Sequence, residues 1–255
     1  MDQNKQYNNN FLSNVIFRID FPQIEQIVEN LPDEFKSKIA TDFPILEPIE
    51  ELAVEFEGTN LEIQTRKVNN KIWKFYSNDK NKAVELNSKY LALIYANKSY
   101  KNFTDFQAVV DKLLEIFFEL YSPGVITRLG LRYINEINID DKSSVLDWSK
   151  YINEKLVENL AFGSSEIELD IRRAFNLFVF NIGSSDFINF KYGIFNQVFP
   201  EKIVNKDFIL DYDCHARSPF TSKEDIISRI TQFNQKLSNL FEDSIKEDLR
   251  VILNK

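Results

Sequence analysis

The stretch Val125–Ile139, VITRLGLRYINEINI, lies near the middle of the chain and has the alternation of a strand. Successive side chains of a strand point to opposite faces. One face of this stretch is apolar except for Asn135, which predicts packing on a core. The other face carries Arg128 and Arg132, with Gly130 between them. We therefore expect a central, half-buried strand with two arginines on its outer side.

These two arginines suit an anionic group. A glycine between them removes a side chain and opens space between the guanidinium groups. Because arginine donates two parallel hydrogen bonds in a fixed plane, such a pair matches a phosphate or a carboxylate. We add Arg18, from an earlier strand, and Asn135 to this predicted ligand site. The alternative is a solvated or ion-paired outer face, with Gly130 at a bulge.

The composition is that of a soluble globular protein, with 255 residues of which 44% are hydrophobic and 27% charged. A formal net charge of −8 argues against non-specific nucleic-acid binding, which needs a basic surface. The single cysteine, Cys214, fits a reducing compartment. Neither an apolar signal segment nor a membrane-spanning apolar run is present in the sequence. We therefore expect a cytoplasmic protein that does not enter a membrane.

The first half of the chain is predicted to contain a strand at 14–21, then a helical stretch that Pro32 interrupts, then a loop at 41–48. Antiparallel strands follow at 52–57, 61–66, 71–77, 83–86 and 90–96, with a hairpin turn at 58–60. An amphipathic helix at 103–121 closes this half, because its apolar residues recur at spacings of four and three.

The second half begins with the central strand. Leu146–Leu160 is predicted as a helix, since apolar residues fall at every fourth position. Three strands are expected next, at 167–182, 187–197 and 207–217. A long helix from Ser222 to Val251 ends the chain, with Ser222 as N-cap and Asp225 at the capping-box position. Its apolar stripe is expected to pack on the sheet, and the alternative is a coiled-coil seam of a homodimer.

The two halves share one order of elements, and the apolar positions of their long helices are offset by a constant interval, from Phe106 to Ile226 onward. We therefore expect an α+β fold of two similar halves (strand, helix, antiparallel strands, long helix), with antiparallel sheets packed against long amphipathic helices. Residues 1–10 are expected to be a disordered tail, followed by halves at 11–122 and 123–255 in one globular unit. The groove between the halves is then the natural binding site. The alternative is that two unrelated α+β halves look alike.

Catalytic signatures are missing from the sequence: it has no glycine-rich phosphate motif, no GxSxG and no HExxH. In the segment LDYDCHAR, Asp211, Asp213 and His215 alternate and so share one strand face. Two carboxylates and an imidazole suit a divalent metal or an acid–base pair. Three ligands from one strand make a poor chelate, and the alternative is a polar solvent face. Cys214 falls on the opposite, apolar face and is expected to be buried.

The segment Arg128–Asn135, RLGLRYIN, resembles the R-[IL]-G-L-R-Y-[IL]-N motif of a sporadically distributed bacterial family that has no assigned activity. Weaker matches to the same family lie at Trp73–Ser77, Val84–Leu86, Tyr100, Phe103, Phe106, Leu237–Phe241 and Ser244–Ile245. The resemblance implies a bacterial cytoplasmic protein, and the family's patchy distribution implies mobile or defence-linked genes. The family supplies no catalytic residues.

From these observations we expect a non-enzymatic binding or accessory module of a bacterial system, such as phage defence or toxin–antitoxin, with a protein partner and no cofactor. One alternative is a binder of an anionic small molecule or nucleotide through Arg128 and Arg132. Another is a metal-dependent hydrolase that uses Asp211, Asp213 and His215.

Overall fold

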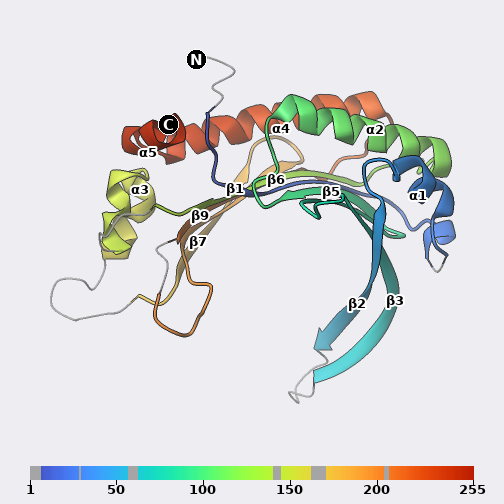
Figure 1. The fold of residues 1–255 in the computed structure, drawn as a ribbon, viewed down its shortest axis with the longest axis horizontal. Helices are drawn as coiled ribbons and strands as arrows, with labels where there is room; N and C mark the ends of the chain where they lie inside the picture. The colour runs from blue at the N-terminus through green and yellow to red at the C-terminus, as the bar shows by residue number, and fades with distance from the viewer. Residues whose placement is uncertain (1–6, 29, 57–62, 140–144, 162–170, 204–206) are drawn as a thin grey trace.

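One antiparallel sheet of nine strands organises the part of the chain that the computed structural model describes, which is residues 7–28, 30–56, 63–139, 145–161, 171–203 and 207–255 (Figure 1). The strand order across the sheet is β2-β3-β4-β5-β1-β6-β9-β8-β7. The strands are β1 (Leu12–Asp20), β2 (Ile45–Phe56), β3 (Ile63–Tyr76), β4 (Lys82–Leu86), β5 (Tyr90–Ala96), β6 (Arg128–Ile137), β7 (Ala174–Asn181), β8 (Asp186–Phe195) and β9 (Asp207–Ala216). The predicted α+β class with antiparallel pairing is confirmed.

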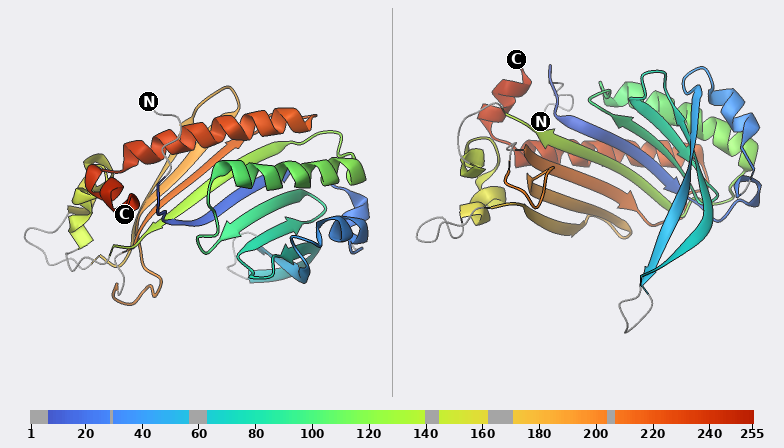
Figure 2. Two further views of the ribbon diagram at one scale, coloured as in Figure 1. Left: turned by 45° about the horizontal axis from the view of Figure 1, so that its top comes forward. Right: turned by 60° about the horizontal axis from the view of Figure 1, so that its bottom comes forward.

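Two long helices, α2 (Phe103–Tyr121) and α4 (Lys223–Ser244), lie side by side on one face of this sheet (Figures 1 and 2). The shorter helices are α1 (Asp33–Ile39), α3 (Glu154–Val157) and α5 (Glu247–Leu253), and the 3-10 turns are η1 (Glu25–Ile27), η2 (Val145–Lys150) and η3 (Glu158–Ala161). Gln107 Nε2 of α2 donates a hydrogen bond to Thr231 Oγ1 of α4 at 2.8 Å. Among the described residues, no helix is long and apolar enough to cross a membrane.

Both long helices begin at a side-chain cap. The N-cap of α2 is Asn102, which accepts a hydrogen bond from the Asp105 amide, and the N-cap of α4 is Ser222, which accepts one from the Asp225 amide. Each cap satisfies an amide that has no partner within the helix, which stabilises the helix by about 1 kcal/mol. The sequence predicted the cap at Ser222 correctly.

The core lies between the helices and the sheet. The apolar stripe of α4 is fully buried, at Ile226, Ile230, Phe233 and Leu237. It packs on its own sheet, as expected, and is therefore not available as a dimer seam. Opposite it, the central strands β1 and β6 show the predicted alternation: Phe17 and Leu131 form a cross-strand pair and are both fully buried.

In the part of the chain that the structure describes, the other face of the sheet has no helix layer and is concave, because the sheet curves away from α2 and α4 (Figure 1). We call it the open face. It carries the intervening side chains of the central strands, among them Arg18 of β1 and Arg128 and Arg132 of β6. The fold thus places the predicted arginines near the middle of a broad, arched surface.

The prediction of one continuous helix at Leu146–Leu160 is wrong. The segment forms the short pieces η2, α3 and η3. Ile152 makes an isolated β-bridge with Ile245, and the Asn153 amide donates to the Ser244 carbonyl at 2.9 Å. These contacts with the end of α4 take the backbone groups that a continuous helix needs.

Two strand boundaries also differ from the expectation. The residues predicted as a loop at 41–48 enter β2 at Ile45, and Pro48 is tolerated because β2 is an edge strand. The strands predicted at 61–66 and 71–77 are one continuous strand, β3. The predicted turn at 58–60 lies outside the described residues.

The first described residues of the chain lie against α5. Residues 1–6 of the predicted tail lie outside the described range, but the Asn9 amide donates to the Leu253 carbonyl at 2.9 Å. The helix predicted to reach Val251 ends at Ser244, and α5 follows as a separate helix. The strand predicted at 167–182 is described from residue 171 onward and forms β7.

Candidate functional site

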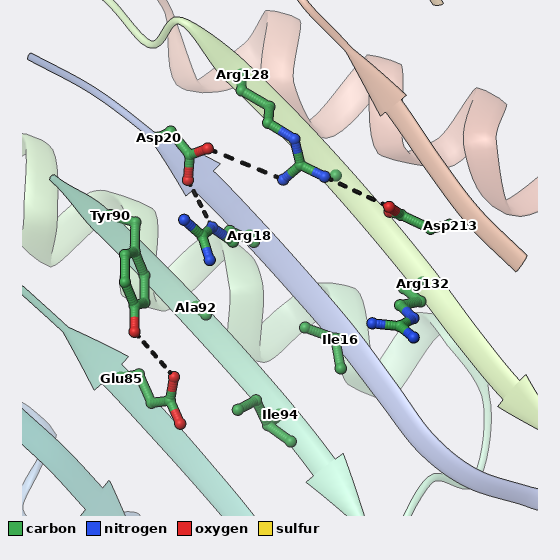
Figure 3. A pocket seen from close by; sticks show the side chains of 11 residues that line it. Ile16, Arg18, Asp20, Glu85, Tyr90, Ala92, Ile94, Arg128, Arg132 and Asp213 are labelled. Atoms are coloured by element: carbon green, nitrogen blue, oxygen red, sulfur yellow. Dashed lines mark hydrogen bonds and ion pairs between the residues drawn. The ribbon is translucent and has the colours of Figure 1, made fainter. Parts of the chain in front are cut away.

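A hollow of about 450 Å³ lies on the open face over the central strands (Figure 3). Its charged and aromatic lining comes from β1, β4, β5, β6 and β9, at Arg18, Asp20, Glu85, Tyr90, Arg128, Arg132 and Asp213, and its apolar lining is Ile16, Ala92 and Ile94. Strand register places these side chains together. Arg18 lies opposite Gly130, and Arg132 lies opposite Ile16.

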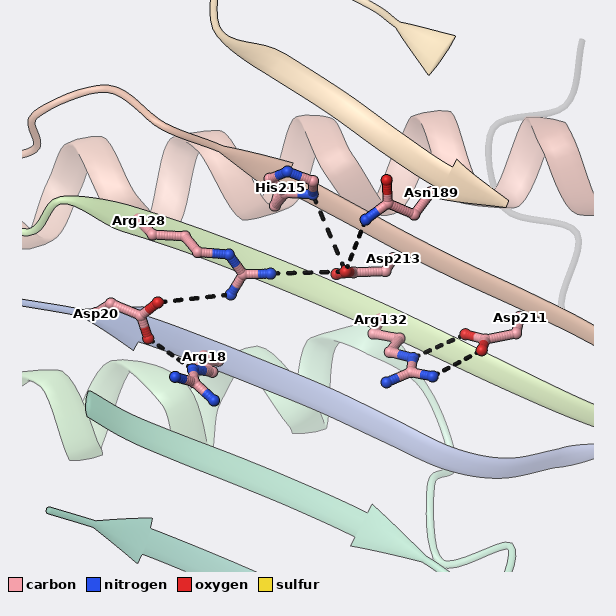
Figure 4. A network of polar contacts seen from close by, with 8 residues as sticks. All are labelled: Arg18, Asp20, Arg128, Arg132, Asn189, Asp211, Asp213 and His215. Carbon is pink, nitrogen blue, oxygen red and sulfur yellow. Dashed lines mark hydrogen bonds and ion pairs between the residues drawn. The ribbon is translucent and has the colours of Figure 1, made fainter. Parts of the chain in front are cut away.

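Arg132 is held by a buried carboxylate of the neighbouring strand β9. Its Nε donates to Asp211 Oδ1 at 2.8 Å and its Nη2 to Asp211 Oδ2 at 2.7 Å, which is a bidentate pair (Figure 4). The Asp211 side chain is only 10% exposed, whereas that of Arg132 is 41% exposed. Hydrogen bonding to Asp211 raises the pKa of Arg132. The guanidinium is thus fixed in one orientation and keeps one edge toward solvent.

Arg128 lies flat over Gly130. A Cβ atom at position 130 would be 3.1 Å from Arg128 Nη1 and 3.3 Å from Nη2. The guanidinium reaches Asp213 Oδ2 at 3.6 Å on one side and Asp20 Oδ2 at 4.0 Å on the other. The expected space between two arginines is therefore filled by one of them. The register of β6 is regular through Gly130, so the glycine serves this stacking and not a bulge.

Arg18 is as accessible as Arg132 and more accessible than Arg128. Its Nε donates to Asp20 Oδ1 at 2.6 Å, and its Cζ lies 4.0 Å from the centre of the Tyr90 ring. Tyr90 in turn donates through its hydroxyl to Glu85 at 3.2 Å. The Arg18 side chain is 42% exposed. Stacking and one hydrogen bond thus orient a guanidinium whose terminal nitrogens face the hollow (Figure 3).

Asp211, Asp213 and His215 do share one face of β9, as the alternation predicted (Figure 4). They do not converge on one point, because Asp211 pairs with Arg132 and Asp213 contacts Arg128. In the described part of the chain, no three His, Cys, Asp or Glu side chains are placed to hold a metal ion. His215 is buried, stacks on Phe187 at 5.7 Å and has its Nδ1 4.0 Å from Asp213 Oδ2.

Asn135 does not join the arginines. It lies on the buried face of β6, where its amide donates to the Leu210 carbonyl at 3.4 Å. Cys214 is fully buried on the same side of the sheet, as expected, and burial raises the pKa of its thiol to about 12.

Sequence reasoning missed the apolar lining of the hollow and three of its charged and aromatic members: Asp20, Glu85 and Tyr90. Asp20 could have been predicted from the sequence, since it follows Arg18 by two residues and so lies on the same strand face. Glu85 and Tyr90 come from β4 and β5, whose register against β1 sets their place.

Acidification is expected to destabilise the fold just below the ordinary His pKa. Burial lowers the pKa of His215 from 6.5, although Asp213 partly opposes the shift. The unfolded chain therefore binds the proton at a higher pH than the folded chain does. The free energy of unfolding should fall as the pH drops below about 6.5 and level off below the folded pKa. Urea unfolding at several pH values between about 5.5 and 7.5 measures this loss.

The variant His215→Gln is the control, because the chain has no second histidine. Its stability should change less than that of the wild type across the same window. Equal pH dependence in both proteins would show that other groups cause the loss.

In comparisons with known proteins, no family model matches this sequence and no curated protein matches it, so the geometry of the open face is the basis for the function proposed below.

Proposed function

We propose that this chain is a non-enzymatic binding module that docks a partner protein on its open face, as an accessory component of a bacterial system such as phage defence or toxin–antitoxin. The observation that carries the proposal is the balance of charge in the hollow. Its lining contains the three arginines and three carboxylates, Asp20, Glu85 and Asp213.

This balance favours a polypeptide over a simple anion. A dedicated phosphate site presents an excess of donors, whereas Arg128 and Arg132 already face the carboxylates of Asp213 and Asp211. A protein surface with both signs of charge can form ion pairs with the arginines and the carboxylates of the hollow at the same time. The ion pairs also fix the side chains before binding, which lowers the entropy cost of association.

The floor of the hollow adds an apolar component. Ile16 and Ile94 are cross-strand neighbours, Arg132 lies on the other side of Ile16, and the Arg18–Tyr90 stack belongs to the same lining. Arginine and tyrosine are enriched among the residues that dominate binding energy, when they are surrounded by contacts that exclude water. Arg18 is therefore the residue whose loss should weaken docking most.

The proposal is tested by comparing three immobilised full-length proteins in lysate of the organism that carries the gene. We expect a partner to be recovered near stoichiometry by the wild type and at least about tenfold less by Arg18→Ala, which equals about 1.4 kcal/mol. Lys112→Ala is the control, because Lys112 forms a solvent-exposed ion pair with Asp42 away from the open face. Recovery that is equal for all three proteins, or no specific recovery, would refute docking at this site.

An anionic small molecule or nucleotide is the second candidate. The outward edges of Arg18 and Arg132 favour it, since both side chains are about two-fifths exposed next to the hollow. Thermal shift with phosphate, citrate and ATP tests it. A stabilisation that Arg18→Ala abolishes and Lys112→Ala keeps would favour this candidate, and unchanged melting with all three probes would count against it.

We also infer that the two halves arose by duplication. The strand order reads outward from the central β1–β6 pair as β5, β4, β3, β2 on one side and β9, β8, β7 on the other, so β2 is an additional strand of the first half. The cross-strand pair Phe17–Leu131 lies on the implied two-fold axis, and the axis exchanges Arg18 with Arg132. The N-caps Asn102 and Ser222 correspond in the same way. The hollow then lies on the pseudo-symmetry axis, where a junction site is expected.

A further inference from the structure

We propose that β7 pairs with the β7 strand of a second copy of this chain, which forms a two-fold symmetric dimer with one continuous sheet. β7 is an edge strand of the sheet (Figure 2). Among the described residues, no strand lies beside its outward backbone N–H and C=O groups, which can therefore pair with another strand. This interface is separate from the hollow and does not depend on the function proposed above.

The side chains of β7 are unusually apolar for an edge. The strand reads AFNLFVFN, and Leu177 is 65% and Val179 62% exposed on one face. On the other face, Phe178 and Phe180 are also exposed, and Phe178 stacks on Tyr192 with ring centroids 6.0 Å apart. Half of the large apolar side chains that are exposed in the described residues thus lie consecutively in one strand.

The two edges of the sheet differ in a way that points to pairing at β7 alone. The edge strand β2, ILEPIEELAVEF, carries a proline and four glutamates. Proline and like charges are the usual means by which proteins block edge-to-edge pairing. β7 contains neither a proline nor a charged residue. The β2 edge is therefore protected against pairing with another strand, whereas the β7 edge is able to pair.

A second copy is the occupant that the sequence of β7 fits. Antiparallel pairing of the strand with itself around Phe178 sets Leu177 against Val179 on the open face and Phe178 against its own copy on the helix face. Every pair formed this way has partners on the same face, as an isologous interface requires. Each chain has a formal net charge of −8, and an uncharged strand lets two such chains approach without placing like charges in contact.

Light scattering on the full-length protein tests the proposal. The wild type should have twice the chain mass of 30.0 kDa. Val179→Lys should raise the dissociation constant by about tenfold or more, because a lysine on an edge strand disfavours pairing. Val251→Lys is the matched control, since Val251 is an exposed valine of α5, and it should remain dimeric. Both variants should melt close to the wild type, which shows that they fold.

A cysteine scan then locates the contact. The only native cysteine, Cys214, is fully buried, so a single new cysteine at 177, 178 or 179 reports on its own copy. The cysteine at 178 should form the intermolecular disulfide most readily under mild oxidation, because residue 178 is opposed to its own copy within bonding range, whereas 177 is opposed to 179. A cysteine at 251 should not. A wild type that is monomeric at about 100 µM would overturn the proposal, and so would a dimer that Val179→Lys leaves intact.

Discussion

Replacing Gly193 with alanine is expected to destabilise the protein by about 3 kcal/mol or more. Gly193 in β8 has φ +144°, a conformation that side chains with a Cβ rarely adopt. A Cβ atom there would lie 1.9 Å from the Ala174 carbonyl oxygen and 3.1 Å from Phe175 Cα. Both are backbone atoms of β7, so the clash cannot be relieved by a side-chain rotation. Urea or thermal unfolding measures the loss, which corresponds to a melting shift of roughly 6–12 °C.

The variant Gly124→Ala separates the cost of a positive φ from the cost of the clash with β7. Gly124 also has a positive φ, of +68°, but a Cβ atom there has nothing within 4 Å. Its substitution should cost only about 1 kcal/mol from backbone conformation. If both variants lose the same free energy of unfolding, backbone strain and not the contact with β7 causes the destabilisation at position 193. Gly193→Ala should also weaken dimerisation, because β7 has to move away from β8 to accommodate the methyl group.

The elements that could be predicted from the sequence are those fixed by local pattern. The alternation in Val125–Ile139 predicted β6 and its two faces, and the capping residues and stripe predicted α4. The predicted helix at Leu146–Leu160 failed because contacts with Ile245 decide that backbone, and no local pattern records a partner so far along the chain. The continuity of β3 was missed because its backbone stays extended through residues 68–70, where its register against β2 shifts, and the sequence there has no apolar alternation.

The candidate site was likewise predictable only where local alternation determines it. Alternation alone placed Arg128 and Arg132 on one face, and it also placed Asp211 and Asp213 on one face of β9. It could not show that the two sets meet. That depends on the register of β6 against β9, which sets Arg132 opposite Asp213 and brings it within reach of Asp211. The sequence therefore presented an anion site and a metal site as rival ideas, whereas in the fold they neutralise each other.

Arg132→Ala is expected to destabilise the fold by about 2 kcal/mol, because it leaves the Asp211 carboxylate without its partner at a position that is only 10% exposed. This figure is below the value for a fully buried pair because Arg132 itself is partly exposed. Asp211→Asn in the Arg132→Ala background should recover part of the loss, since a neutral amide is cheaper to bury than an unpaired charge. Urea unfolding of the wild type, both single variants and the double variant gives the coupling energy, which we expect to be about 1 kcal/mol or more.

Arg18→Ala provides the comparison with a more exposed carboxylate, Asp20, which Arg128 Nη1 also approaches at 4.0 Å. Arg18 and Arg132 are almost equally exposed, and each donates to an aspartate from its Nε, but Asp20 is 26% exposed where Asp211 is 10%. Removing Arg18 should therefore cost less than about 1 kcal/mol. If the two variants lose the same stability, carboxylate burial is not what makes the Arg132–Asp211 pair structural. If they differ as expected, Arg132 chiefly holds β6 to β9, and Arg18 remains the arginine that is available to a partner.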